Sequence, residues 1–133
     1  MQHYRLYING EFRESACRRE IINPATGEPF ARASFAEAKE IECALAAARS
    51  AYDGGPWRTL TPDKRKEFLL KIAQGIREEA AELARIETFN TGKPTKETTF
   101  MDIPSSAETF EYFANHAEEL LQAETLSITS PVA

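Results

Sequence analysis

The 133-residue sequence has only two cysteines, two histidines and one tryptophan, and it has no long apolar run. A membrane-spanning helix needs about 20 consecutive apolar residues, so we expect no transmembrane segment. The amino terminus has no apolar stretch of the kind that marks a secretory signal. Two cysteines are too few for a disulfide framework. Together these absences predict a cytoplasmic protein in a reducing compartment.

Positive charge is outnumbered by negative charge. Lys and Arg number 16 against 21 Asp and Glu, which gives a formal net charge of −5. The densest basic run, residues 64–66, is flanked by Asp63 and Glu67 and is typical of a solvated helix face. Such a chain offers no cationic stripe for phosphates. We therefore expect no nucleic-acid partner.

The common signatures of catalysis and cofactor binding are missing as well. The glycines are scattered without a Gly-x-Gly-x-x-Gly, and the Gly-Lys pair at 92–93 lacks the other residues of a phosphate loop. His3 and His116 are isolated. Cys17 and Cys43 lie 26 residues apart, with no second pair to complete a metal site. The residues taken singly thus assign no catalytic or cofactor-binding group.

Short alternating segments at the start of the chain predict β-strands. Residues 4–8 alternate, and Asn9-Gly10 predicts a type I′ hairpin turn, because that turn needs positive φ at both central positions. The return strand is expected over residues 11–13. Further strands are expected over residues 19–22 and 30–35, on either side of an Asn-Pro-Ala-Thr-Gly turn at 23–27.

After these strands the apolar residues recur with the period of an α-helix. Ser34 and Glu37 have the spacing of a capping box. Ile41 and Leu45 begin an apolar stripe that the Asp-Gly-Gly-Pro segment at 53–56 ends. We therefore expect a first helix between these two boundaries.

Two more helical segments follow. The Thr-Pro pair at 61–62 has the residue types preferred at the N-cap and the first helical position. The apolar stripe after it runs to about residue 90 and contains Gly75, so a break or bend is expected. Pro104 restarts a helix, and residues 126–132 alternate like a strand. The fold class expected is α+β, with a short amino-terminal hairpin and strands followed by three or four helices.

Several short motifs occur in a fixed order along the chain. They are Tyr-Ile-Asn-Gly-Glu-Phe at 7–12, Asn-Pro-Ala-Thr-Gly-Glu at 23–28, Trp-Arg at 57–58, Thr-Gly-Lys-Pro at 91–94 and Asp-Ile-Pro at 102–104. In this order and spacing they resemble the amino-terminal region of the aldehyde dehydrogenase superfamily. The resemblance implies that residues 1–133 form a single amino-terminal segment, a partial domain of that α/β fold. The catalytic domain and most of the nucleotide-binding domain would be absent.

The resemblance also implies an activity for the intact protein. Superfamily enzymes oxidise an aldehyde to a carboxylic acid with NAD or NADP, using a cysteine thiolate and a glutamate that activates water. Both groups and the cofactor motif would lie beyond Ala133, and neither Cys17 nor Cys43 has the nucleophile's sequence context. We therefore expect no activity and no cofactor binding from this segment alone. The alternative is a stand-alone helical interaction module without enzymatic activity.

Two features of the superfamily match positions in this chain. Many members hold a monovalent cation with backbone carbonyls and a side-chain oxygen, and the matching positions are Ile21, Ile22 and Asn90. The neutral Asn90 replaces the usual acid, and its alternative role is that of a helix-ending asparagine. The wall of the substrate entrance would come from Met101 to Ser105, for which the alternative is plain helix packing.

The resemblance finally predicts self-association of the chain as a homo-oligomer. In superfamily enzymes these helices pack against the nucleotide-binding domain, which the segment would lack. Apolar stripes that include Leu45, Ile72 and Leu83 would then be uncovered. A soluble monomer seldom leaves a contiguous apolar patch larger than a few hundred Å² exposed.

Overall fold

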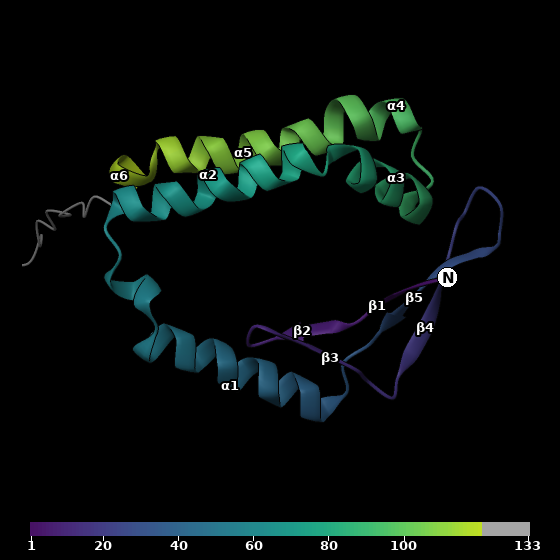
Figure 1. Cartoon of the computed structure of the whole chain (residues 1–133), viewed down its shortest axis with the longest axis horizontal. Helices are drawn as coiled ribbons and strands as arrows, with labels where there is room; N and C mark the ends of the chain where they lie inside the picture. The colour runs from purple at the N-terminus through teal and green to yellow at the C-terminus, as the bar shows by residue number, and fades with distance from the viewer. Residues whose placement is uncertain (121–133) are drawn as a thin grey trace, which may run out of the picture.

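The computed structural model describes residues 1–120, and it places five short strands before a series of helices (Figure 1). The elements are β1 (Gln2–Tyr4), β2 (Leu6–Ile8), β3 (Glu11–Arg13), β4 (Arg18–Ile22), β5 (Pro29–Ser34), α1 (Ala38–Gly54), the 3₁₀ turn η1 (Pro56–Thr59), α2 (Pro62–Glu78), α3 (Ala80–Thr91), α4 (Thr95–Glu97), the π-helical turn η2 (Thr98–Asp102), α5 (Ile103–Asn115) and α6 (Ala117–Leu120). The expected α+β class is confirmed. The strand expected over residues 126–132 lies outside the described residues.

The hairpin formed by β2 and β3 has the turn that its sequence predicts. Asn9 has a φ of 53° and Gly10 a φ of 81°, so both central positions are left-handed, as a type I′ turn requires. Across the hairpin Tyr7 is paired with Phe12, and their ring centroids are 5.1 Å apart.

A second sheet has the strand order β1-β5-β4. β1 is parallel to β5, with Gln2 opposite Ala31, whereas β4 is antiparallel to β5. The single strand expected over residues 4–8 is therefore wrong, because the chain leaves one sheet for the other at Arg5. Local alternation could not reveal this, since the parallel partner lies almost thirty residues further along the chain.

The start of α1 also differs from the expectation. The N-cap is Glu37, which forms a capping box with Glu40. Ser34 remains in β5, where it is paired with Arg18 of β4 and its hydroxyl lies 3.1 Å from Nε2 of His3. The capping role assigned to Ser34 is thus wrong, because strand pairing extends further than the local motif indicates. The helix ends at Gly54, as expected.

Helices α2 and α5 form the main helix pair and run antiparallel along one side of the molecule (Figure 1). Their buried positions are small: Ala73, Ala107 and Ala114 are all at most 1% exposed. Side chains of this size let the two backbones approach closely. The expected break before residue 90 is confirmed, and it falls at Glu79, between α2 and α3.

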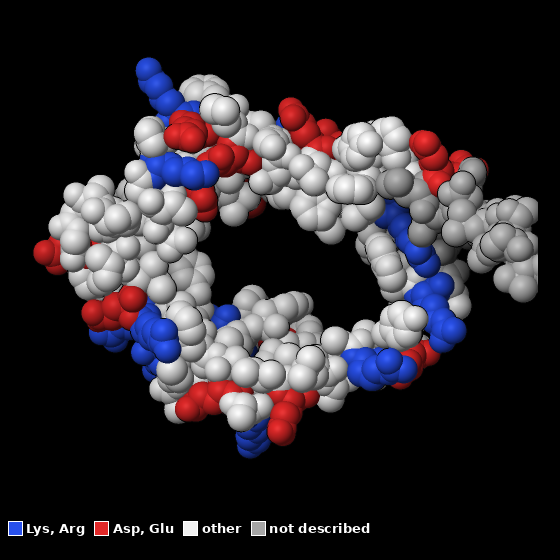
Figure 2. All heavy atoms as spheres, turned by 180° about the vertical axis from the view of Figure 1, so that it is seen from behind, with Lys and Arg blue, Asp and Glu red and all other residues white. Residues whose placement is uncertain are grey.

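Much of the apolar surface has no partner within the described residues. Helix α1 buries none of its side chains, and Leu45 is 66% exposed. Ile72 of α2 is 45% exposed. An opening separates α1 and the strands from the α2–α5 pair, and it persists when all atoms are drawn (Figure 2). Within residues 1–120, no helix combines the length and apolar character needed to span a membrane.

Candidate functional site

Two turns that are distant in sequence pack against each other at one end of the molecule. Gly92 ends α3 in the left-handed conformation, with a φ of 78°, and its amide donates to the Thr88 carbonyl at 2.9 Å. A Cβ placed on Gly92 would lie only 2.8 Å from Cγ of Pro24. The Thr-Gly-Lys-Pro motif therefore needs glycine for two reasons, its backbone conformation and the proximity of the Asn-Pro-Ala-Thr-Gly turn.

The Asn-Pro-Ala-Thr-Gly turn is ordered by its own polar groups. Asn23 Oδ1 accepts from the amide of Ala25 at 3.0 Å, and the Asn23 carbonyl accepts from the amide of Gly27 at 2.8 Å. Gly27 has a φ of 74°, the left-handed conformation that glycine adopts without strain. The turn thus presents Pro24 to Gly92 on a hydrogen-bonded frame.

The candidate cation ligands lie beside this contact. Ile21 and Asn90 line the same surface pocket, of about 250 Å³, whose other walls are mostly apolar. Ile22 follows at a β-bulge in β4, is 45% exposed and does not line the pocket. Asn90 belongs to the last turn of α3, two residues before Gly92. The structure thus brings two of the three expected residues together.

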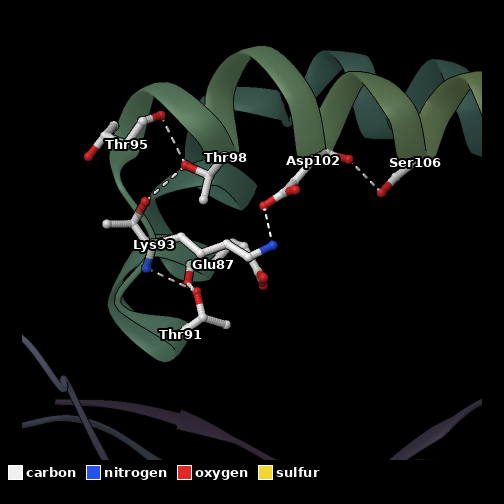
Figure 3. Close-up of polar contacts among 8 residues, drawn as sticks. Glu87, Thr91, Lys93, Thr95, Thr98, Asp102 and Ser106 are labelled. Atoms are coloured by element: carbon white, nitrogen blue, oxygen red, sulfur yellow. Dashed lines mark hydrogen bonds and ion pairs between the residues drawn. The ribbon is translucent and has the colours of Figure 1, made fainter.

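A π-helical turn connects α4 to α5, and sequence patterning did not predict it. η2 begins at Thr98, which is fully buried. Thr98 Oγ1 donates to the Thr95 carbonyl at 3.1 Å (Figure 3). The hydroxyls of Thr88 and Thr98 are 2.9 Å apart, and because the Thr98 proton is used in the first bond, Thr88 Oγ1 is the donor in the second. A π turn opens the helix wider than an α turn, and such turns are frequent at functional sites.

The other end of η2 is joined to the Thr-Gly-Lys-Pro turn by an ion pair. Lys93 Nζ lies 2.8 Å from Asp102 Oδ2 (Figure 3). The hydrogen bond to Asp102 raises the pKa of the Lys93 amine above its ordinary value, and the charge of Asp102 adds to this effect. On α5, Ser106 Oγ donates to the Asp102 carbonyl at 2.8 Å. Asp102 thus connects three segments through its carboxylate and its backbone.

The expected entrance residues lie on this part of the chain. Met101 is on η2 and 64% exposed, and Ser105 is exposed in the first turn of α5. Next to Met101, Phe100 is 75% exposed, although sequence reasoning had not selected it. The adjacent apolar residues Phe100 and Met101 were the sequence feature that could have indicated Phe100.

A larger hollow, of about 610 Å³, lies where η1 meets α1 and α2, with Tyr52 and Arg58 in its lining. Arg65 of α2 donates through Nη2 to the carbonyls of Trp57 and Arg58, both at 3.3 Å. Arg65 Nε is buried and has no hydrogen-bond partner among the described residues. Arg65 thus joins the Trp-Arg motif to the helix that follows it.

Residues 1–120 contain no group of three or more His, Cys, Asp or Glu that could hold a metal ion. Cys17 and Cys43 are half-buried free thiols in the strand region and α1 respectively. We assign neither of them a catalytic role.

A sequence model of the aldehyde dehydrogenase family matches residues 12–132. Aldehyde dehydrogenase 1 of Tanacetum cinerariifolium is 39% identical over 128 residues, 95% of this chain and 26% of that protein. Aminoacetaldehyde dehydrogenase of Pseudomonas aeruginosa is 35% identical over 130 residues, 96% of this chain and 25% of that protein. The chain belongs to the aldehyde dehydrogenase family, and it spans about a quarter of the length of these relatives.

Solved structures agree with this assignment. The NAD⁺ complex of an aldehyde dehydrogenase from Bacillus cereus superposes with a TM-score of 0.88 at 32% identity, covering 96% of this chain and 26% of that one. A betaine aldehyde dehydrogenase variant from Staphylococcus aureus gives a TM-score of 0.83 at 36% identity, covering 96% and 25%. The described fold thus matches about a quarter of each of these two solved chains.

Proposed function

We propose that residues 1–133 are the amino-terminal segment of an NAD(P)-dependent aldehyde dehydrogenase, which oxidises an aldehyde to a carboxylic acid. The observation that carries the proposal is the family match over residues 12–132, with relatives about four times as long. The relative solved with NAD⁺ supports the choice of cofactor. The uncovered faces of α1 and α2 agree with a segment that packs against further protein.

We propose that the segment alone binds no nicotinamide dinucleotide. The placement of Gly10, Gly27 and Gly92 in three separate turns, rather than in one glycine-rich loop before a helix, supports this. We therefore assign no catalytic or cofactor-binding step to residues 1–120. Their role in the proposed enzyme is to position its other parts.

Two ligand contacts belong to the proposal. A monovalent cation binds the carbonyls of Ile21 and Ile22 and the side-chain oxygen of Asn90, and the pocket shared by Ile21 and Asn90 supports this. Because Asn90 is neutral, the affinity is lower than an acid would give. Met101 and Ser105 form part of the wall of the substrate entrance, which their exposure supports.

The assay of the isolated chain is direct. The 133-residue protein is incubated with NAD⁺ or NADP⁺ and with short aliphatic and betaine-type aldehydes, and reduced cofactor is followed by absorbance. We expect no turnover, and no cofactor binding by calorimetry. Turnover above a heat-inactivated control, lost on Cys17→Ser or Cys43→Ser, would overturn this part of the proposal.

The second candidate function is a helical interaction module without enzymatic activity. The exposed face of α1 favours it, because Leu45 and Tyr52 are both more than 60% exposed. The parent reading frame discriminates the two functions, since only the enzyme requires a downstream cysteine nucleophile and a dinucleotide site. Whether the chain is an enzyme segment or an interaction module, we propose that it self-associates through its uncovered helix faces. We also propose a cytoplasmic location, which the small number of cysteines, two in 133 residues, supports.

A further inference from the structure

The hollow where η1 meets α1 and α2 brings two arginine side chains together. Its lining consists of Ala51, Tyr52, Trp57, Arg58 and Arg65, so among the described residues its charged groups are two guanidinium groups and no carboxylate. Neither arginine forms an ion pair within residues 1–120. Two like charges in a partly apolar site repel each other and lose hydration, so the hollow favours an anion.

Arg65 is held in place, but its hydrogen-bonding capacity is only partly used. Its Nη2 donates to the carbonyls of Trp57 and Arg58, both at 3.3 Å. Its Nε is buried and has no hydrogen-bond partner in the part of the chain that the structure describes. Buried polar atoms in native proteins are nearly always hydrogen-bonded, so we expect an acceptor from outside these residues.

Arg58 lies beside this anchored guanidinium group and is held less firmly. Its guanidinium carbon is 5.9 Å from the centroid of the Tyr52 ring. That distance is close to the limit beyond which a cation–π interaction is negligible. The planar guanidinium group binds a carboxylate well, because it can donate two parallel hydrogen bonds to it.

The apolar surface next to the hollow indicates what carries the carboxylate. Ile41, Leu45 and Tyr52 share one face of α1 at helical spacings, and each is between 49% and 66% exposed. The short helix η1 lies at one end of the opening between α1 and the α2–α5 pair (Figure 1). A small acid in the hollow would leave this face uncovered, whereas a protein segment can cover the hollow and the face together.

The remainder of the intact protein can supply such a segment, because the aldehyde dehydrogenase relatives are about four times as long as this chain. We infer that the hollow of Arg58 and Arg65 is a docking site for an Asp- or Glu-bearing segment of the intact protein outside residues 1–133. The carboxylate of this segment binds the two guanidinium groups, and its apolar neighbours cover the exposed face of α1. The inference rests on the proposed function only in requiring that the intact protein is longer than this chain.

The test compares variants of Arg58 in the 133-residue chain and in the intact protein by thermal melting. Arg58→Glu brings a negative charge near Arg65, so the melting temperature of the 133-residue chain should stay unchanged or rise. In the intact protein the same substitution opposes two carboxylates, so the melting temperature should fall by several degrees. Arg58→Met should have little effect on the 133-residue chain and should also lower the melting temperature of the intact protein.

Arg49→Met is the matched control, because the partner of Arg49 is Asp53 on the same helix, at 2.7 Å. It should change the melting temperature by the same small amount in both proteins. Phenylglyoxal, which modifies guanidinium groups, gives a second readout through mass spectrometry. Arg58 should be modified about tenfold more slowly in the intact protein than in the 133-residue chain, a factor that corresponds to about 1.4 kcal/mol for opening the contact.

The outcomes distinguish this occupant from the others. Equal effects of Arg58→Glu in the two proteins, or equal modification of Arg58, would overturn the inference. Protection of Arg58 that appears in the 133-residue chain as its concentration rises would assign the hollow to a second copy instead. A rise in the melting temperature of the intact protein with benzoate, lost in Arg58→Met, would assign it to a free acid. Aldehyde oxidation enters none of these readouts, so an intact protein without that activity would defeat the proposed function and leave this inference to be decided by them.

Discussion

Replacement of Gly92 by alanine should destabilise the chain through two separable effects. With a φ of 78°, an L-residue in this conformation costs about 1–2 kcal/mol. The new Cβ would also lie 2.8 Å from Cγ of Pro24, and forcing extra volume into a packed contact costs about 1–3 kcal/mol. The free energy of unfolding of Gly92→Ala should therefore fall by about 2–5 kcal/mol in total.

Two other glycines separate these effects in urea unfolding of the same chain. Gly27 has a φ of 74° but nothing within 4 Å of a built Cβ, so Gly27→Ala should show only the conformational cost of about 1–2 kcal/mol. Gly54 has neither feature, and Gly54→Ala should be neutral or slightly stabilising. Adding Pro24→Ala to Gly92→Ala should recover part of the loss. Equal effects for Gly92→Ala and Gly27→Ala would refute the claim that the two motif turns pack together.

Further predictions follow from other contacts. Thr98→Val should lower the free energy of unfolding by about 1–3 kcal/mol, because the partners of a buried hydroxyl are left unsatisfied; thermal melts that match wild type would contradict this. Arg77 lowers the pKa of the Glu111 carboxyl by hydrogen bonding and charge. The contribution of this ion pair to the free energy of unfolding is therefore present at neutral pH. It is lost as the pH falls through the lowered pKa, which lies below the ordinary value of about 4.3. Arg77→Met should remove this part of the acid dependence, as urea unfolding at several pH values would reveal. The melting temperature should be higher in K⁺ than in choline at the same concentration, and Asn90→Asp should enlarge this difference. A difference equal to that of wild type would argue against the cation site. Light scattering after size exclusion should show oligomers of the 133-residue chain at micromolar concentration, and a monomer throughout the range would contradict self-association.

Local chemistry predicted several elements correctly. Asn9-Gly10 specifies its hairpin because positive φ at both positions selects one type of turn. Thr61 caps α2, accepting from the Lys64 amide at 3.4 Å, with Pro62 at the start of the helix. In both cases the determining contacts lie within four residues, where sequence patterns are informative.

Long-range pairing decided the features that the sequence did not reveal. Ser34 has the residue type and spacing of a cap, but its pairing with Arg18 keeps it in β5. The π turn has no sequence period of its own, and Lys93 and Asp102 are nine residues apart, which is not a helical spacing. The family resemblance predicts that Ile21 and Asn90 share a cation site. Their presence in one pocket is visible only in the structure, because they are distant in sequence.

The proposed dehydrogenase function is tested by one measurement on the intact protein that carries residues 1–133. This measurement is the production of reduced cofactor that depends on added aldehyde. We expect turnover with NAD⁺ or NADP⁺, stoichiometric formation of the carboxylic acid, and no turnover by the 133-residue chain at the same molar concentration. An intact protein that binds neither cofactor and oxidises none of the short aliphatic, aromatic and betaine-type aldehydes would contradict it.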